Sequence, residues 1–410
     1  IGFYAHYDGQ PLDPREWTSP PFEPTLRDAR GQAILLPAAG APIDPEWRVY
    51  ARSAGDDKAP IVALMSAIDA LRAAGLSLKA NVKFAFEGEE EAGSANLLRI
   101  LSSNRDLAKA DVWLMCDGPV HQTRRQLVYF GSRDGVRLDL TVYGARNELH
   151  SGHYGNWAPN PGMLLTELVA SLRDTDGRIL IDHFMDDVVP PTPTEITAAR
   201  AVPPVDEDLR RSLLLNRTEA NNAPLAERIM LPALNLRGMR VGQVGASANN
   251  AVPTEAEASI DFRLVPNQTP EHIRQLLQAH LTARGWFVVH AAPTPAERLA
   301  HPKVVRLTAE GGYPAYRTSM DQPVSKAVRQ VVSQVIGRDV IALPTLGGSV
   351  GMSEFYDVLQ VPLITLPIVN HDNAQHAKDE NIRLQNLWDG IEVFAGVMTR
   401  LGNTWATVVP

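Results

Sequence analysis

A chain of 410 residues can fold as two average domains, and a composition with 44% hydrophobic and 21% charged residues is typical of a globular protein. The net charge of −8, with both signs interspersed, argues against a nucleic-acid surface, and no run of about 20 apolar residues predicts a membrane span. The single cysteine, Cys116, excludes an internal disulfide and leaves a cytoplasmic or an exported location open. Residues 1–5 already resemble a buried strand, so we expect further residues before Ile1.

The first third of the chain alternates between predicted strands and helices. Apolar runs at residues 1–5, 82–86 and 112–116 are typical of strands. Residues 61–71 carry apolar side chains at helical spacing, and another helix is expected to begin near Ser94. This alternation predicts an α/β fold with a mostly parallel sheet that has helices on both faces.

The middle of the chain has a different pattern. Residues 136–142 and 256–264 alternate between apolar and polar side chains, as strands with one buried face do. Helices are predicted to begin at Pro161 and Pro270. The pattern predicts an α+β unit inserted into the first one. The proline-rich residues 182–226 are expected to form a long excursion.

The last part of the chain returns to the α/β pattern. A helix is predicted to begin at Pro323, a buried strand is expected at residues 361–368, and a final amphipathic helix follows. We therefore expect residues 1–134 and 309–410 to build one α/β domain and residues 135–308 to form the inserted α+β domain.

Histidines and carboxylates follow several of the predicted strands. Because ligands bind outside the carboxyl ends of the strands in open α/β sheets, we expect these side chains to meet at one edge. Carboxylates clustered there need a counter-ion, and bound divalent cations are the simplest one. The metal-ligand candidates are His6, Asp56, Glu91, Asp117 and His376.

The ligand types limit the metal and the chemistry. Two histidines and three carboxylates without a cysteine suit Zn²⁺, with Mn²⁺ or Co²⁺ as alternatives. Five ligands are too many for one tetrahedral zinc but fit two metals that share a bridging carboxylate and a water. In the Glu90–Glu91 pair, one glutamate can bind metal while the other serves as general base. These features predict a two-metal hydrolase.

These segments resemble the co-catalytic zinc metallopeptidases, which include carnosinase-type dipeptidases, glutamate carboxypeptidase, acetylornithine deacetylase and succinyl-diaminopimelate desuccinylase. The resemblance extends from residues 4–9 to residues 373–376, and residues 86–94 and 148–152 are most similar to the dipeptidase branch. It implies a catalytic domain with an inserted lid domain through which the protein forms a homodimer.

The resemblance implies a role for each ligand candidate. Asp56 is similar to the bridging carboxylate, which is often followed by a cis peptide bond. His6 and Asp117 would complete one metal site, and Glu91 and His376 the other. His371 is an alternative ligand to His376. Residues 372–375, which lead into His376, favour His376 as the ligand.

The remaining roles concern catalysis and substrate binding. Glu90 is similar to the general base, and Asp8 to the residue that orients His6. His150 matches a histidine that stabilises the oxyanion, usually across the dimer. The residues that resemble substrate contacts are Asn250, Arg263, Gly348 and Ser349.

Substrate preference stays open at this point. Thr345 and Leu346 stand where close dipeptidases have Arg-Glu. The leading hypothesis is an exopeptidase or dipeptidase that acts on dipeptides or short peptides. A deacylase of N-acyl amino acids would use the same chemistry. A catalytically silent, metal-binding dimeric scaffold would be expected to lack a ligand or the base, and this sequence retains candidates for both.

Overall fold

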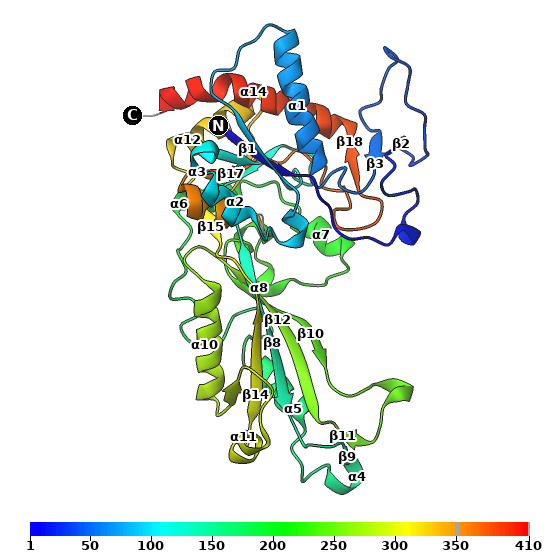
Figure 1. Cartoon of the computed structure of the whole chain (residues 1–410), viewed down its shortest axis with the longest axis vertical. Helices are drawn as coiled ribbons and strands as arrows, with labels where there is room; N and C mark the ends of the chain where they lie inside the picture. The colour runs from blue at the N-terminus through cyan, green and yellow to red at the C-terminus, as the bar shows by residue number, and fades with distance from the viewer. Residues whose placement is uncertain (349–351, 409–410) are drawn as a thin grey trace.

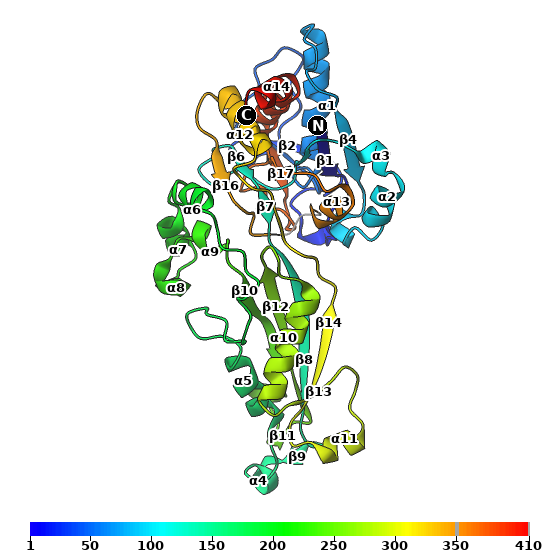
Figure 2. The same ribbon diagram turned by 90° about the vertical axis from the view of Figure 1, so that its left-hand side faces the viewer.

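Two units of mixed α and β structure lie end to end along the long axis of the molecule (Figure 1). The computed structural model describes residues 1–348 and 352–408. Both ends of the chain lie in the first unit, and the middle of the chain forms the second (Figures 1 and 2). None of the helices in these residues is long and apolar enough to cross a membrane.

The first unit contains a six-stranded sheet. Its strands, in spatial order, are β16 (Ile341–Leu343), β6 (Leu127–Tyr129), β17 (Leu363–Thr365), β5 (Trp113–Met115), β1 (Gly2–His6) and β4 (Lys83–Glu87). β17 and β6 pair antiparallel, and the other neighbouring strands pair parallel. Side chains alternate across β1, so Phe3 belongs to the core on one face and Tyr4 to the core on the other.

Helices cover both faces of this sheet, as predicted. The face lined by Phe3 carries α1 (Lys58–Ala73), α12 (Pro323–Ile336) and α14 (Leu384–Val408). The face lined by Tyr4 carries α2 (Leu97–Ser103), α3 (Arg105–Ala108) and α13 (Met352–Leu359). The ring centroids of Phe3 and Phe394 are 5.8 Å apart, and those of Tyr4 and Phe355 are 5.3 Å apart. Aromatic packing therefore anchors β1 from both sides.

The second unit is built on a five-stranded sheet. Its strands, in spatial order, are β10 (Ala233–Arg240), β12 (Glu255–Leu264), β8 (Asp134–Tyr143), β14 (Val304–Glu310) and β13 (Phe287–Val289). β13 and β14 are parallel, and the other neighbours are antiparallel. The core of this unit packs α5 (Pro161–Ala170) and α10 (Pro270–Ala283) against the sheet.

Shorter elements complete both units. In the first unit they are β2 (Thr25–Arg27), β3 (Arg48–Tyr50), β18 (Asn381–Arg383), β7 (Gly131–Ser132), β15 (Tyr316–Arg317), η1 (Pro14–Glu16) and η2 (Glu90–Ala92). In the second they are β9 (Leu149–His150), β11 (Ala251–Val252), α4 (Ser151–Tyr154), α11 (Pro295–Ala300) and η3 (Gly245–Ser247).

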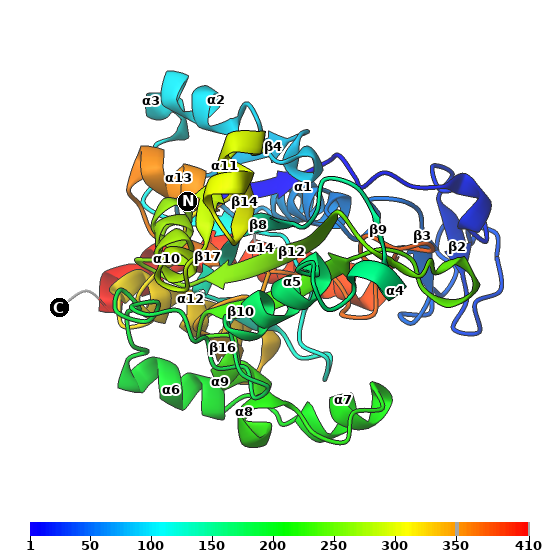
Figure 3. The same ribbon diagram turned by 90° about the horizontal axis from the view of Figure 1, so that it is seen from below.

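The proline-rich excursion returns to the first unit. It forms α6 (Pro193–Arg200), α7 (Asp206–Ser212), α8 (Glu219–Asn222) and α9 (Leu225–Arg228). Val202 and Ala226 pack against the apolar cluster formed by β6 and β16. The helix α6 lies close to β16 (Figure 2). Seen along the long axis, α6–α9 lie on the opposite side of the molecule from α2 and α3 (Figure 3). The middle of the chain therefore also contributes to the edge of the first sheet.

The expected fold class is confirmed, while one strand is shorter than expected. Thr269 caps α10 by accepting a hydrogen bond from the His272 backbone N–H, as the Thr-Pro pair predicts. The strand expected at residues 361–368 is reduced to β17, because Pro362 and Pro367 flank it and lack the N–H that a ladder requires.

Phe394 is fully buried between α14 and β1, and we predict that Phe394→Ala lowers the free energy of unfolding by about 3–5 kcal/mol. Urea denaturation followed by fluorescence would measure this change. Leu299→Ala removes a side chain that is 89% exposed and serves as the control, with an expected change within about 0.5 kcal/mol. Equal effects of the two substitutions would contradict the packing described for α14.

Candidate active site

The predicted ligand segments meet at the carboxyl edge of the first sheet. His6 is the last residue of β1, and Asp117 follows the end of β5. Glu91 lies in η2, just beyond β4. Asp56 lies between β3 and α1, and His376 lies between β17 and β18. His6, Glu91 and Asp117 reach one place because the parallel strands β1, β4 and β5 end there, and the loops before α1 and β18 add Asp56 and His376.

His6 is fully buried, and its imidazole faces carboxylates on both sides. Its Nδ1 lies 3.2 Å from Asp8 Oδ1, and its Nε2 lies 3.0 Å from Asp56 Oδ1. The other oxygen of Asp8, Oδ2, accepts a hydrogen bond from the Glu91 backbone N–H at 3.0 Å. Asp8 therefore contacts both the imidazole of His6 and the backbone of the turn that carries Glu91.

The carboxylate of Asp56 lies between two histidines. Its Oδ2 is 3.1 Å from His376 Nε2, and the same nitrogen lies 3.4 Å from Glu91 Oε2. The peptide bond between Asp56 and Asp57 is cis. One carboxylate that faces two histidines has the arrangement that a ligand shared by two metals requires.

The donor set fits divalent cations. Among the described residues, ligand atoms of His6, Asp57 and Asp117 lie within 4.8 Å of one another, and so do those of His6, Asp56 and Glu91. Asp57 Oδ1 is buried, and within the described chain it has no hydrogen-bond partner. Buried carboxylate oxygens are costly unless a donor or a cation compensates them, so this cluster suits bound metal ions.

The pKa values of the cluster show how strongly the carboxylates interact. Burial, followed by the charge of Asp56, raises the pKa of Asp117 to about 7. Burial, followed by the charge of Asp117, also raises the pKa of Asp57 well above its usual range. Burial lowers the pKa of His6, but the hydrogen bond to Asp56 and the nearby carboxylates outweigh it and raise this pKa to about 11. Bound divalent cations would stabilise the same carboxylates in their charged form.

Glu90 lies beside the ligand cluster. Its Oε2 is 3.9 Å from His6 Nε2, which is beyond hydrogen-bond distance. Burial, followed by the charge of Asp117, raises the pKa of Glu90 to about 8. A carboxyl group with a pKa near neutrality that borders a cavity is suited to take up and release a proton.

A cavity of about 600 Å³ connects the ligand cluster with the second unit. Glu90, Glu91 and His376 line it from the first unit, and Arg263 of β12 lines it from the second. The Arg263 Nε donates a hydrogen bond to Asp261 Oδ2 at 2.9 Å, which orients the guanidinium group. Arg263 therefore borders the same space as the ligand cluster.

Three further candidates among the described residues do not line this cavity: the catalytic candidate His150 and the substrate-binding candidates Asn250 and Gly348. His150 pairs with Ala251 in the short β9–β11 ladder at the far end of the second unit, and Asn250 precedes that ladder (Figure 1). Gly348 is exposed and is not among the residues that border the cavity. Ser349 lies outside the described residues.

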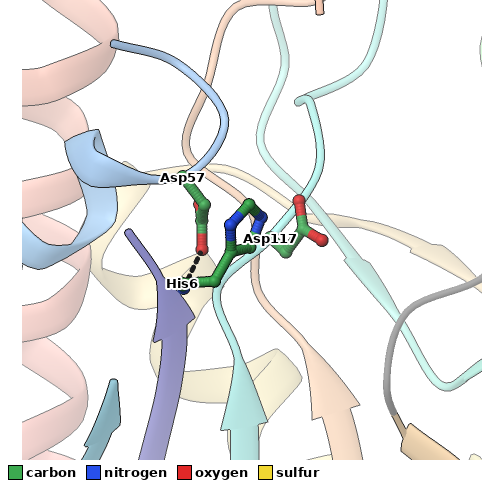
Figure 4. A group of neighbouring side chains, drawn as sticks. All are labelled: His6, Asp57 and Asp117. Carbon is green, nitrogen blue, oxygen red and sulfur yellow. Dashed lines mark hydrogen bonds between the residues drawn. The ribbon is translucent and has the colours of Figure 1, made fainter. Parts of the chain in front are cut away.

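Two acidic residues of the site, Asp57 and Glu380, are not among the candidates that the sequence predicted. Asp57 is fully buried and accepts a hydrogen bond from the His6 backbone N–H at 3.3 Å (Figure 4). Only its adjacency to Asp56 points to the site. Glu380 is also buried, and its Oε1 accepts a hydrogen bond from the Asp56 backbone N–H at 2.9 Å. Its position four residues after His376 predicts no such contact.

Curated relatives of the chain are peptidases. The Cys-Gly metallodipeptidase dug1 of Schizosaccharomyces pombe is 26% identical over 406 residues, which cover 98% of this chain and 79% of the relative. The human Beta-Ala-His dipeptidase is 25% identical over 404 residues, which cover 96% of this chain and 73% of the relative.

A solved structure and a family model agree with these relatives. An M20 family metallo-carboxypeptidase from Sulfolobus solfataricus superimposes with a TM-score of 0.79 and 27% identity, covering 98% of this chain and 85% of the other. The model of peptidase family M20/M25/M40 matches residues 2–400. The predicted family is therefore confirmed: the chain belongs to peptidase family M20/M25/M40 and is a metal-dependent hydrolase of peptide bonds.

Proposed function

We propose that this enzyme is a dipeptidase that holds two divalent metal ions and cleaves dipeptides with free amino and carboxyl ends. The observation that carries the proposal is the position of the Asp56 carboxylate, with one oxygen 3.0 Å from His6 and the other 3.1 Å from His376. The curated relatives named above, a Cys-Gly and a Beta-Ala-His dipeptidase, support a dipeptide substrate.

In this proposal His6 and Asp117 would hold one metal, Glu91 and His376 would hold the other, and Asp56 would be shared by both. Zn²⁺ suits these ligands best, with Mn²⁺ or Co²⁺ as alternatives. When bound, such ions polarise a carbonyl group and lower the pKa of a bound water to about 7. Asp57 Oδ1, which is buried without a hydrogen-bond partner in the described chain, is a further atom that such a cation would stabilise.

Glu90 is the proposed general base. It borders the cavity and lies near the ligand cluster without a hydrogen bond to His6. In this role its carboxylate takes the proton from the attacking water and delivers it to the leaving amine. Burial favours proton uptake by Glu90, because it disfavours the charged carboxylate and raises its pKa.

The charges that border the cavity favour a substrate with two charged ends. The guanidinium of Arg263 suits a carboxylate. Glu354 is 7% exposed, lines the same cavity and accepts a hydrogen bond from the Ser353 hydroxyl at 2.9 Å. A buried carboxylate that faces a cavity favours an ammonium group over a neutral N-acyl group. This difference is the reason to prefer a dipeptidase to an N-acyl-amino-acid deacylase.

A homodimer is part of the proposal. β10 lies at the edge of the second sheet, where Leu236, Met239 and Val241 are exposed. An edge strand with exposed apolar side chains is suited to pair with a second copy of the chain. His150 would then act in the partner's active site, because in its own chain it lies at the far end of the second unit. There it would help to stabilise the oxyanion.

We predict that removal of metal with a chelator abolishes hydrolysis of a dipeptide panel and that Zn²⁺, Mn²⁺ or Co²⁺ restores it, with about two metals bound per chain. The panel would include N-acetylated forms of the same dipeptides and N-acyl amino acids. Preference for free amino ends would support the dipeptidase. Preference for N-acyl amino acids would favour the deacylase, and metal-loaded protein that cleaves neither would favour a silent scaffold.

Glu90→Gln is expected to lower kcat by about 10²–10⁴-fold while metal content is retained, because the amide cannot accept the proton. Metal analysis and steady-state kinetics on the same sample would measure both properties. The matched control is Glu89→Gln, since Glu89 is an exposed neighbour that binds Asn96. Turnover close to wild type in the Glu90 variant would show that another group moves the proton.

A mixture of subunits would test the role of His150. Glu90→Gln and His150→Ala proteins are each expected to be nearly inactive, whereas their co-expressed mixture is expected to recover about a quarter of wild-type activity. Half of randomly assembled dimers are mixed, and each mixed dimer contains one intact site. Sedimentation would verify the dimer, and absence of recovery would contradict a site shared between two chains.

A further inference from the structure

The loop that carries Asp56 is buried but has no regular secondary structure. It leads from β3 to α1, and its backbone N–H groups need acceptors because they are removed from water. The carboxylate of Glu380 supplies these acceptors. Its Oε1 accepts hydrogen bonds from Gly55 at 3.0 Å and Asp56 at 2.9 Å, and its Oε2 accepts one from Ser53 at 3.1 Å.

A buried cation balances the charge of this carboxylate. Arg52 donates a hydrogen bond from Nη1 to Glu380 Oε2 at 2.7 Å, and the two side chains are 4% and 1% exposed. The guanidinium also lies over the Trp17 ring, 5.1 Å from its centroid. Three backbone donors and one guanidinium thus meet the acceptor capacity of a carboxylate that is almost completely removed from water.

Glu380 also belongs to the segment that carries His376. It directly precedes β18, which pairs antiparallel with β3 so that Asn381 lies opposite Tyr50. The Glu380 backbone carbonyl accepts a hydrogen bond from the Ala51 N–H at 3.1 Å. The main chain and the side chain of Glu380 therefore both join the two segments that supply Asp56 and His376.

We propose that Glu380 is a positioning residue that fixes the Asp56 carboxylate relative to His376 and thereby sets the affinity of the site for its metal ions. The inference rests on the proposed function, in which Asp56 is the bridging ligand. Displacement of the Asp56 backbone by a few tenths of an ångström would alter its distances to both histidines, which are 3.0 Å to His6 and 3.1 Å to His376. Residues that orient ligands in this way affect metal affinity by about 10–100-fold.

A second buried ion pair provides a matched control. Arg317 Nε lies 3.0 Å from Glu195 Oε1, and these side chains are 7% and 3% exposed. Glu195 also accepts a hydrogen bond from the Thr192 backbone N–H, as Glu380 does from its own loop. The pair joins α6 to β15 and has no contact with the ligand cluster in the described structure. Loss of either carboxylate leaves a buried arginine unpaired, so both losses destabilise the fold.

The experiment compares Glu380→Gln with Glu195→Gln. Gln at position 380 keeps one carbonyl oxygen but places an amide NH₂ beside N–H donors. Metal-free proteins would be titrated with Zn²⁺ in competition with a chromophoric chelator, well below their melting temperatures. We expect both substitutions to lower the melting temperature of the metal-free protein, and E380Q alone to weaken zinc binding by about tenfold or more. Dipeptide hydrolysis at saturating zinc would be measured alongside.

Two further variants separate charge from backbone support. Glu380→Asp keeps the negative charge but is one methylene shorter, so it is expected to weaken zinc binding. This variant also tests the proposal if E380Q does not fold. Arg52→Lys keeps a cation beside Glu380 and leaves its three backbone hydrogen bonds, so it is expected to retain zinc affinity.

The outcomes distinguish this inference from the proposed function. Wild-type zinc affinity in E380D and in any folded E380Q protein would overturn the role of Glu380 while leaving the dipeptidase proposal intact. An equal loss of affinity in E195Q would also overturn it, because the effect would then follow general destabilisation. Wild-type protein that binds no zinc would contradict the proposed function itself.

Discussion

The crowding of carboxylates around His6 is the constraint on which the rest of the active site depends. Asp8 and Asp56 approach the two imidazole nitrogens, and Asp57 accepts the hydrogen bond of the His6 backbone N–H. Like charges at such distances repel one another in a buried setting unless protons or cations neutralise them. Backbone N–H groups hold two of these carboxylates in place, since Asp57 accepts from His6 and Asp8 accepts from Glu91. The same repulsion makes the cluster suitable for divalent metal ions.

The two units contribute different parts of the chemistry. The first sheet supplies a rigid edge, because aromatic packing on both faces anchors β1, whose last residue is His6. The second sheet supplies Arg263 from β12, whose alternate side chains are buried against α5 and α10. Residues from both units line the cavity. A substrate there would contact groups whose relative distance depends on how the two units sit against each other.

Much of the site could be predicted because its ligands follow regular elements. His6 and Asp117 come directly after predicted strands and Glu91 lies a few residues beyond another, so the α/β pattern brings them together. The contacts of Glu380 could not be predicted in this way. They join a side chain to backbone N–H groups more than 300 residues away, and hydrogen bonds of that kind leave no spacing pattern in a sequence. The return of α6–α9 to the first sheet was equally hidden, since short apolar residues such as Val202 and Ala226 do not identify their partner.

The path of the proline-rich segment has a mechanical consequence. The chain enters the second unit near residue 134, returns to the first at residues 185–193, re-enters the second at 229–233 and leaves it at 310–316. A domain inserted through a single pair of connections can swing about one short hinge. Here any rotation of one unit against the other must bend additional tethers on the side of α6–α9. These additional connections therefore restrict the directions in which the second unit can tilt. They also limit how far Arg263 can move from the ligand cluster across the cavity.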